Sequence, residues 1–368
     1  MLRNPFTPIF GGKPDTFFGR EDILHRFDLA LADADSESRY LFLTGTYGIG
    51  KTALLEQLSR RASRREWYAI DLGPDDTVLQ LLHTLDKYGK VTTGLSGSSM
   101  VRTTHFGREE LQPLLLSACK HTERGILVTI DEIQKVPIDD VSAICNAFQM
   151  ASRKGYDILL VVAGLPFAYE LVTNHEGCSF LRRGSHEEVG LFTWEEADAA
   201  FHDVFSRMGD IAVSQEAIDV LNKESKGQPY LMQLLGYYLV REIGAHTSKP
   251  VKVTAECVER STRLAHTAYE RRALRPLLSE LDALEVSHLR AMSSALDEDR
   301  IASTAAISER LQKTPQQLSK TRGHLIDLGY IASVGYGKLV FCIPYLADYV
   351  TKPLESTGNL KVIRQRRV

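Results

Sequence analysis

The fold of this chain is decided by Gly45-Thr46-Tyr47-Gly48-Ile49-Gly50-Lys51-Thr52, eight residues that fit the phosphate-binding pattern G-x-x-x-x-G-K-[ST]. The aromatic and apolar run at residues 39–44 predicts a buried strand before the loop. From Ala53 onward apolar residues recur at helical spacing. Glycines let backbone N–H groups turn toward phosphate oxygens, and the following helix adds its positive dipole end. The sequence therefore predicts a nucleoside triphosphate site at residues 45–53.

Two residues of this loop and two acidic residues further along have predicted chemical roles. Lys51 supplies a positive charge for the β- and γ-phosphates, and the Thr52 hydroxyl supplies a ligand for Mg²⁺. Residues 125–130 predict a short apolar strand, and Asp131 and Glu132 follow it directly. We expect Asp131 to hold Mg²⁺ through its water shell and Glu132 to act as general base on the attacking water. Because Glu132 is present, we predict hydrolysis and not binding alone.

These two motifs resemble the Walker A and Walker B elements of the AAA+ and STAND group of ATPases. Phe17-Phe18-Gly19-Arg20-Glu21 resembles the hhGRE box of that group, and Gly227-Gln228-Pro229 resembles its G-x-P motif. The resemblance is closest to origin-recognition-like and archaeal-type ATPases with a C-terminal winged helix. It implies that the cofactors are ATP and Mg²⁺, that Arg20 borders the adenine, and that Pro229 caps the base from a helical lid.

The chain departs from that family pattern at several positions. Ala163-Gly164-Leu165-Pro166 provides no polar side chain where many members orient the lytic water, so Gln134 or Thr129 would have to substitute, or turnover is slow. Tyr230 stands where initiator-type members often have an arginine. Arg182 and Arg183 stand where the family often has an arginine finger, which would imply a homo-oligomer. Their alternative interpretation is two solvated arginines that close a helix.

The order of the predicted elements gives an α/β fold. Strands and helices alternate up to residue 191, which predicts a P-loop parallel sheet with helices on both faces. Helices alone are expected after that, opened by a capping box at Thr193. We predict a nucleotide-binding domain at 1–191, an α-helical lid at 192–278, a winged-helix domain at 279–350 and a basic C-terminal tail at 351–368.

The third predicted domain carries the second functional signal. A helix at 302–311 and a second helix opened by Thr314 are followed by two strands around residues 335–337, as in a winged helix-turn-helix. Gln316, Gln317 and Lys320 fall on the outer face of the second helix, and Lys338 lies at the wing tip, so these four are the predicted nucleic-acid contacts. Residues 300–368 hold eleven Lys/Arg against four Asp/Glu, whereas the whole chain has a net charge of −3. A basic region on an acidic body favours double-stranded DNA as partner.

Composition leaves the class of partner open. The sequence has no apolar run long enough for a membrane span, no signal-peptide core and five scattered cysteines without a C-x-x-C pair, so we expect a cytoplasmic protein without a membrane partner. One interpretation is an ATP-hydrolysing protein that binds DNA under nucleotide control. The alternative is a STAND-like switch that docks a protein partner. A third, simpler one is an ATPase whose C-terminal domain is inert.

Overall fold

The computed structural model describes residues 4–9, 17–92, 107–122, 124–209, 211–244 and 251–352. The chain divides into two compact units. The first comprises Met1–Tyr269 with Asp327–Gly329, and the second comprises Glu270–Ile326 with Tyr330–Val368. The predicted basic tail lies outside the described residues from 353 onward. The domain boundaries at 191, 278 and 350 stay predictions.

The first unit is built on a five-stranded parallel sheet in the order β2-β3-β4-β1-β5. Thr44 at the end of β1 pairs with Gly164 of β4, and Ile130 at the end of β3 pairs with Val162. The carboxyl ends of the three central strands therefore meet at one edge, where ligands of open α/β sheets bind. The predicted parallel sheet is confirmed, with strands β1 (Tyr40–Thr44), β2 (Tyr68–Leu72), β3 (Ile126–Ile130), β4 (Ile158–Gly164) and β5 (Ser185–Glu188).

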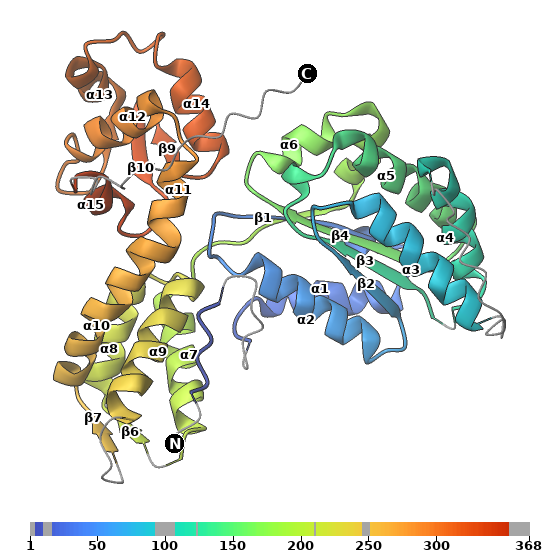
Figure 1. The fold of residues 1–368 in the computed structure, drawn as a ribbon, viewed down its shortest axis with the longest axis horizontal. Helices are drawn as coiled ribbons and strands as arrows, with labels where there is room; N and C mark the ends of the chain where they lie inside the picture. Colours follow the sequence, from blue (N-terminus) through green and yellow to red (C-terminus); the bar gives the residue numbers. More distant parts are fainter. Residues whose placement is uncertain are drawn as a thin grey trace, which may run out of the picture. The chain divides into compact units, whose positions relative to one another are not determined.

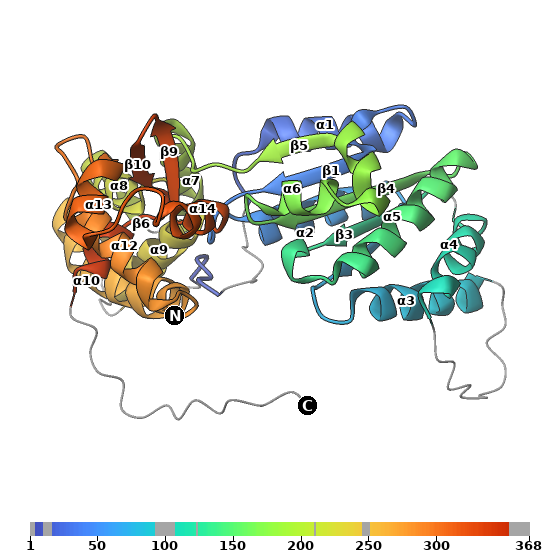
Figure 2. The same cartoon turned by 90° about the horizontal axis from the view of Figure 1, so that it is seen from above.

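Helices cover both faces of this sheet (Figures 1 and 2). Alternate residues of a strand point to opposite faces, so Leu41 and Leu43 join one core cluster while Phe42 joins the other. The first cluster is closed by α1 (Glu21–Ala32) and α2 (Lys51–Ser63). The second is closed by α3 (Thr77–Thr92), α4 (Leu111–Cys119), α5 (Ile138–Arg153) and α6 (Ala168–Thr173). The two faces thus have separate cores that hold the central strands rigid.

The lid follows the sheet as a group of four helices. Its first helix opens with the predicted capping box, since the Thr193 hydroxyl accepts from the Glu196 N–H and the Glu196 carboxylate accepts from the Thr193 N–H. The expectation of helices alone is wrong, because Ile211–Val213 (β6) pairs in parallel with Val251–Val253 (β7). Three-residue strands are too short to leave a periodic signal. The helices are α7 (Trp194–Ser206), α8 (Gln215–Ser225), α9 (Pro229–Gly244) and α10 (Ala255–Tyr269).

The second unit begins with a single π-helical turn, Glu270–Leu274, that leads into α11 (Arg275–Ser279). Its three-stranded sheet has the order β8-β10-β9, with antiparallel pairing. The buried Tyr330 hydroxyl donates to the Leu277 carbonyl at 2.8 Å and ties the sheet to α11. The remaining elements are α12 (Ala283–Ser293), β8 (Ala302–Ser303), α13 (Thr304–Leu311), α14 (Ser319–Asp327), β9 (Ile331–Gly335), β10 (Lys338–Phe341) and α15 (Leu346–Val350).

The predicted order of helix, turn, helix and hairpin is present, with two corrections of boundaries. Residues 302 and 303 belong to the sheet, so the first helix begins at Thr304. The second helix begins at Ser319 and not at Thr314. The capping box of Thr314 and Gln317 nevertheless forms, with the Thr314 N–H donating to Gln317 Oε1 at 2.8 Å. Its turn is not continued into regular helix until Ser319.

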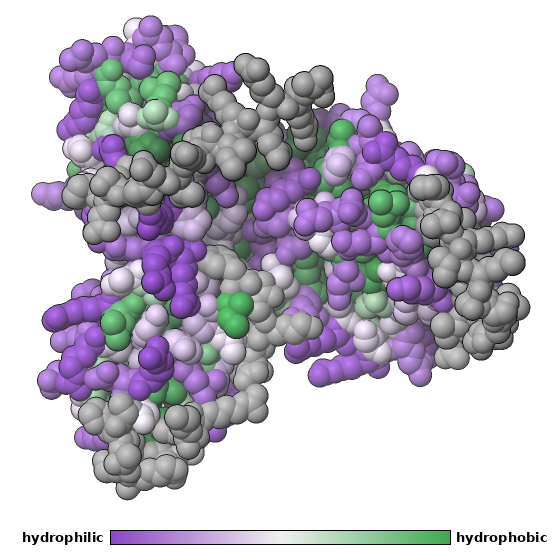
Figure 3. All heavy atoms as spheres, in the orientation of Figure 1, coloured by the Kyte–Doolittle hydropathy of each residue, from purple (hydrophilic) through white to green (hydrophobic). Residues whose placement is uncertain are grey.

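The visible surface of both units is mostly hydrophilic, and apolar residues show only as small separate patches (Figure 3). Among the helices of the described ranges, none combines the length and the apolar character that crossing a membrane requires.

Candidate nucleotide-binding site

The phosphate-binding loop lies between the end of β1 at Thr44 and the start of α2 at Lys51. Gly48 has a φ of 74° and Gly50 a φ of 94°, a left-handed conformation that favours glycine. A Cβ at Gly48 would also lie 3.1 Å from Gln228 Nε2 and 3.2 Å from Tyr230 Cβ. Two of the glycines in the motif are therefore required by backbone conformation.

Lys51 lies inside this loop. Its side chain is only 6% exposed, and Nζ donates to the carbonyls of Gly45 at 2.9 Å and Thr46 at 3.0 Å. Burial lowers the pKa of Lys51, and the nearby carboxylates of Glu132 and Asp131 act in the opposite direction. The loop carbonyls thus hold the ammonium group where phosphate oxygens would replace them as partners.

Thr52 and Asp131 meet across the carboxyl edge of the sheet. The Thr52 hydroxyl donates to Asp131 Oδ2 at 2.5 Å, and Asp131 Oδ1 accepts from the Glu132 N–H at 2.9 Å. A hydroxyl and a carboxylate in contact are the oxygen donors that Mg²⁺ takes in phosphate sites, where water and substrate oxygens complete the shell. The residues present therefore fit a magnesium site.

The Glu132 carboxylate lines the pocket and is restrained by two donors. Its Oε2 accepts from Gln134 Nε2 at 2.8 Å and lies 3.1 Å from Lys135 Nζ. Of the two residues predicted as substitutes for the missing polar group, Gln134 lies at this site. Thr129 does not, because its hydroxyl donates to Asp71 at 2.7 Å on the neighbouring strand β2.

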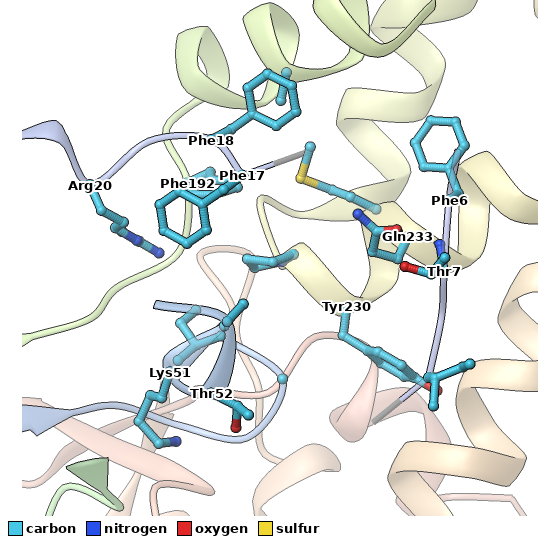
Figure 4. A pocket seen from close by; sticks show the side chains of 18 of the residues that line it. Phe6, Thr7, Phe17, Phe18, Arg20, Lys51, Thr52, Phe192, Tyr230 and Gln233 are labelled. Atoms are coloured by element: carbon cyan, nitrogen blue, oxygen red, sulfur yellow. Dashed lines mark hydrogen bonds between the residues drawn. The ribbon is translucent and has the colours of Figure 1, made fainter. Parts of the chain in front are cut away.

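The pocket runs from the loop to the lid (Figure 4). Lys51 and Thr52 lie at one end, and Phe6, Thr7 and Gln233 lie at another. The predicted residues that line it are Arg20, Tyr47, Gly48, Ile49, Gly50, Lys51, Thr52, Ala53, Glu132 and Pro229. Gly45 and Thr46 instead serve as acceptors for Lys51.

Arg20 borders an aromatic part of this pocket. Its guanidinium lies 4.7 Å from the centre of the Phe192 ring and donates to the Gly190 carbonyl. Burial lowers the pKa of Arg20, although Glu196 and Glu21 raise it. A Cβ at the preceding Gly19 would lie 2.9 Å from the same Phe192 ring. Arg20 thus lines the pocket together with Phe17, Phe18 and Phe192, and its contact with the adenine stays a prediction.

The lid is hydrogen-bonded directly to the phosphate-binding loop. Gln228, only 2% exposed, donates through Nε2 to the Tyr47 carbonyl at 3.1 Å. The Tyr230 N–H donates to the Gly48 carbonyl at 3.2 Å. Tyr230, which replaces the arginine of the family pattern, therefore contributes its backbone to the loop. Two hydrogen bonds therefore connect the segment around Pro229 to the loop.

Sequence reasoning missed the N-terminal segment. The Thr7 N–H donates to Gln233 Oε1 at 2.8 Å, and Asn4 Nδ2 donates to the Tyr237 carbonyl at 3.1 Å, so the segment lies along α9. Phe6 packs so closely on this helix that a Cβ at Gly236 would lie 2.3 Å from its ring. An isolated glycine inside a strongly helical run was the available signal, since such glycines usually have a packing reason.

Arg182 and Arg183 are not brought to this pocket. They end the 3₁₀ segment Glu176–Arg183, both are exposed, and Arg182 donates to Asn174 Oδ1. Neither arginine is among the residues that line the pocket. Their role as a finger toward a neighbouring copy stays a prediction.

The four predicted nucleic-acid contacts are all exposed in the second unit. Gln316 and Gln317 lie in the turn before α14 and not on the helix itself, and Gln317 is occupied by its bond to Thr314. Lys320 lies in the first turn of α14, and Lys338 opens β10. Within the described residues, neither lysine forms an ion pair, so both charges are available to a ligand.

Comparison with known proteins agrees with this geometry. Residues 16–162 match the family model described as "AAA ATPase domain", and residues 271–350 match a "Domain of unknown function (DUF8462)". A search of curated protein sequences found none that matches this chain.

Several solved structures share the fold. Cdc6p from Pyrobaculum aerophilum is 16% identical with a TM-score of 0.51, covering 92% of this chain and 95% of that one. ORC2 from Aeropyrum pernix, in ADPNP and ADP complexes, is 14% identical with a TM-score of 0.51, covering 93% and 95%. A variant of RuvB from Thermotoga maritima is 16% identical with a TM-score of 0.50, covering 95% and 100%. Residues 16–162 therefore match an AAA ATPase domain, and the chain shares its fold with these solved structures.

Proposed function

We propose that this protein hydrolyses ATP and binds double-stranded DNA under the control of the bound nucleotide. The observation that carries the first half is the contact of Thr52 with Asp131 at 2.5 Å beside the buried Lys51 and the pocket-lining Glu132. A phosphate cradle, a magnesium ligand pair and a general base are the parts that phosphoryl transfer requires. All three lie at one edge of a rigid sheet.

In this proposal each residue has a distinct task. Lys51 leaves the loop carbonyls for the phosphate oxygens. Thr52 and Asp131 would hold Mg²⁺, which would supply positive charge to neutralise the charge that develops on the phosphates. Glu132 accepts a proton from the attacking water as the water oxygen bonds to the γ-phosphorus and the bond to the β-phosphate oxygen breaks. The products are ADP and phosphate.

The choice of adenine rests on the family resemblance and on the pocket wall. Pro229 and the aromatic group of Phe17 and Phe192 offer flat apolar surfaces to a base, with Arg20 beside them. That ORC2, with the same fold, has been seen with ADPNP and ADP supports an adenine nucleotide here.

Nucleotide control is proposed because residues of both the lid and the loop line the same pocket. A nucleotide in the pocket would contact Pro229 of the lid and Lys51 of the loop at the same time, while Gln228 and Tyr230 already bond the loop carbonyls. Gain or loss of the γ-phosphate would then shift the balance between lid conformations by its differential contacts. The helical chain that ends the lid at Tyr269 continues into the second unit at Glu270.

DNA binding is proposed from the second unit. Exposed Lys320 and Lys338, without ion pairs among the described residues, suit phosphates, and Gln316 suits a base edge or a phosphate. The excess of positive charge over residues 300–368 supports the same partner. We propose Gln317 as a weaker contact because its amide is occupied by Thr314.

Charge reversal tests this half of the proposal. The double variant Lys320→Glu and Lys338→Glu is expected to bind duplex DNA at least tenfold more weakly and to lower the salt slope by about 2. The double variant Lys120→Glu and Lys154→Glu changes the net charge equally on exposed sites of the first unit and serves as the control. Equal losses of DNA affinity in both double variants would contradict the proposal that Lys320 and Lys338 contact DNA.

A protein partner is the second candidate, and one observation favours it. Tyr336 at the tip of the hairpin is fully exposed, and its neighbour Val334 is half exposed. An apolar tip of this kind suits docking to a protein as in a STAND-like switch. We also propose that Arg182 or Arg183 contacts a second copy of this chain. This self-association is compatible with either DNA or a protein as the partner.

A further inference from the structure

Gln134 connects the general base to the end of a neighbouring strand. Its Oε1 accepts from the Leu165 N–H at 3.2 Å, directly after β4, and its Nε2 donates to Glu132 Oε2 at 2.8 Å. We propose that Gln134 is a positioning residue that holds the Glu132 carboxylate for attack on ATP. The inference rests on the proposed ATPase activity. It assigns to the Gln134 side chain the polar contact that no side chain of residues 163–166 can supply.

The end of β4 is shaped to receive this amide. Leu165 has a buried apolar side chain, so its backbone N–H is the donor that it offers to the amide. A Cβ at Gly164 would lie 2.8 Å from Gln134 Oε1, a distance that atoms of this kind do not adopt. The glycine therefore permits the close approach, and the backbone donor replaces the polar side chain that the family places here.

The amide orientation follows from its two partners. Oε1 has to face the Leu165 N–H because an oxygen accepts and a nitrogen does not. Nε2 consequently faces Glu132 as a donor. Gln134 itself lies in the 3₁₀ turn Ile133–Lys135, which is closed by the Lys135 N–H on the Glu132 carbonyl at 2.8 Å. The Leu165 backbone thus holds the amide at one end, and the 3₁₀ turn fixes the backbone of Gln134 itself.

The bridge restrains one oxygen of Glu132 and leaves the other to the pocket. Gln134 Nε2 and Lys135 Nζ both contact Oε2, and Oε1 receives no hydrogen bond from the described residues. Glu132 also has a left-handed φ of 52°, which aims the residue differently from a continuing strand. A carboxylate held in this way presents Oε1 to a water, and pre-set geometry of that kind is what makes a base effective.

Lys135 cannot replace Gln134 in this role. Its side chain is 58% exposed and forms no second ion pair among the described residues, so its contact with Glu132 competes with water. The amide of Gln134 is anchored to Leu165, directly after β4, the central strand next to the loop strand β1. Replacement of Gln134 should therefore lower kcat more than replacement of Lys135.

The test compares turnover with ATP binding in variants of the full chain. Gln134→Glu keeps size and the contact with Leu165 but removes the donor to Glu132, and Gln134→Ala removes both contacts. We expect kcat to fall about 10- to 100-fold in both, with the Kd for ATP within about twofold of wild type. Lys135→Ala should lose less, and Gln112→Glu, an exposed glutamine on α4, provides the matched control.

The outcomes separate this inference from the function on which it rests. Turnover that is lost in Glu132→Gln but kept within threefold in Gln134→Glu would overturn the role of Gln134 and leave the ATPase intact. A rise of kcat in Gln134→Ala would show that the bridge inhibits the base and would likewise overturn positioning. Equal losses of kcat and ATP affinity would indicate a structural role only. No turnover by the wild-type protein, with ATP bound, would overturn both proposals.

Discussion

Replacement of Glu132 by glutamine separates chemistry from binding at this site. The substitution Glu132→Gln keeps the shape of the side chain and exchanges the carboxylate for an amide that cannot accept a proton. The amide oxygen can still accept from Gln134 and Lys135, whose contacts in the wild type are 2.8 and 3.1 Å. The bond from Thr52 to Asp131 and the Glu132 N–H bond to Asp131 do not involve the changed group. ATP binding should therefore survive.

The size of the loss follows from the role of the base. General-base catalysis typically contributes about 10²- to 10⁴-fold in rate. At about 1.36 kcal/mol for each factor of ten, the barrier should rise by about 2.7 to 5.4 kcal/mol. The lost ion pair with Lys135, which is 58% exposed, should cost under about 1 kcal/mol of stability. The variant should therefore fold normally and lose nearly all turnover.

Phosphate release at saturating ATP measures kcat, and the fluorescence of a labelled ATP analogue measures Kd. Glu170→Gln, an exposed residue on α6 without an ion pair among the described residues, controls for the change in charge. A kcat within threefold of wild type would refute the assignment of Glu132 as base. A loss of ATP affinity equal to the loss of turnover would show that Glu132 acts in binding.

Three further variants probe other parts of the account. Lys51→Ala should weaken ATP binding by at least 100-fold, because a charge-assisted contact is worth about 1.5–3 kcal/mol and several phosphate oxygens share it. A thermal shift by ATP as large as that of the wild type would contradict the assignment. Phe6→Ala should raise the Kd for ATP about three- to tenfold by loosening the pocket wall on α9; an unchanged Kd would separate that segment from the site. Burial lowers the pKa of His288 to about 4, so the unfolded chain takes up a proton below its pKa of about 6.5 that the folded chain refuses. Stability should therefore fall between pH 6.5 and 4, and urea denaturation of His288→Leu should show a shallower fall than wild type.

The central elements of the site could be predicted because each has a local signal. The loop motif, the apolar strand before Asp131 and the capping box at Thr193 all depend on residues near one another in sequence, and the structure confirms their placement. The parallel sheet follows from alternation of strands and helices, which leaves few other arrangements.

Other features depend on contacts that no local pattern specifies. The sequence does not decide whether Thr129 or Gln134 substitutes for the missing polar group. The structure decides it, because Asp71 lies opposite Thr129 on β2 and accepts from the Thr129 hydroxyl. The segment at residues 4–9 contacts Gln233, 226 positions away. The predicted start of α14 is wrong because the capping box at Thr314 forms without a regular helix directly behind it.

The most direct test of nucleotide control is fluorescence anisotropy of a labelled DNA duplex with ATP, with ADP and without nucleotide, across a series of salt concentrations. The account predicts a steep salt slope and tighter binding in one nucleotide state than in the others, with the difference abolished in Lys51→Ala. Identical affinity in all three states would contradict nucleotide control. The absence of binding at low salt in every state would contradict DNA as the partner and favour a protein docked at the hairpin tip.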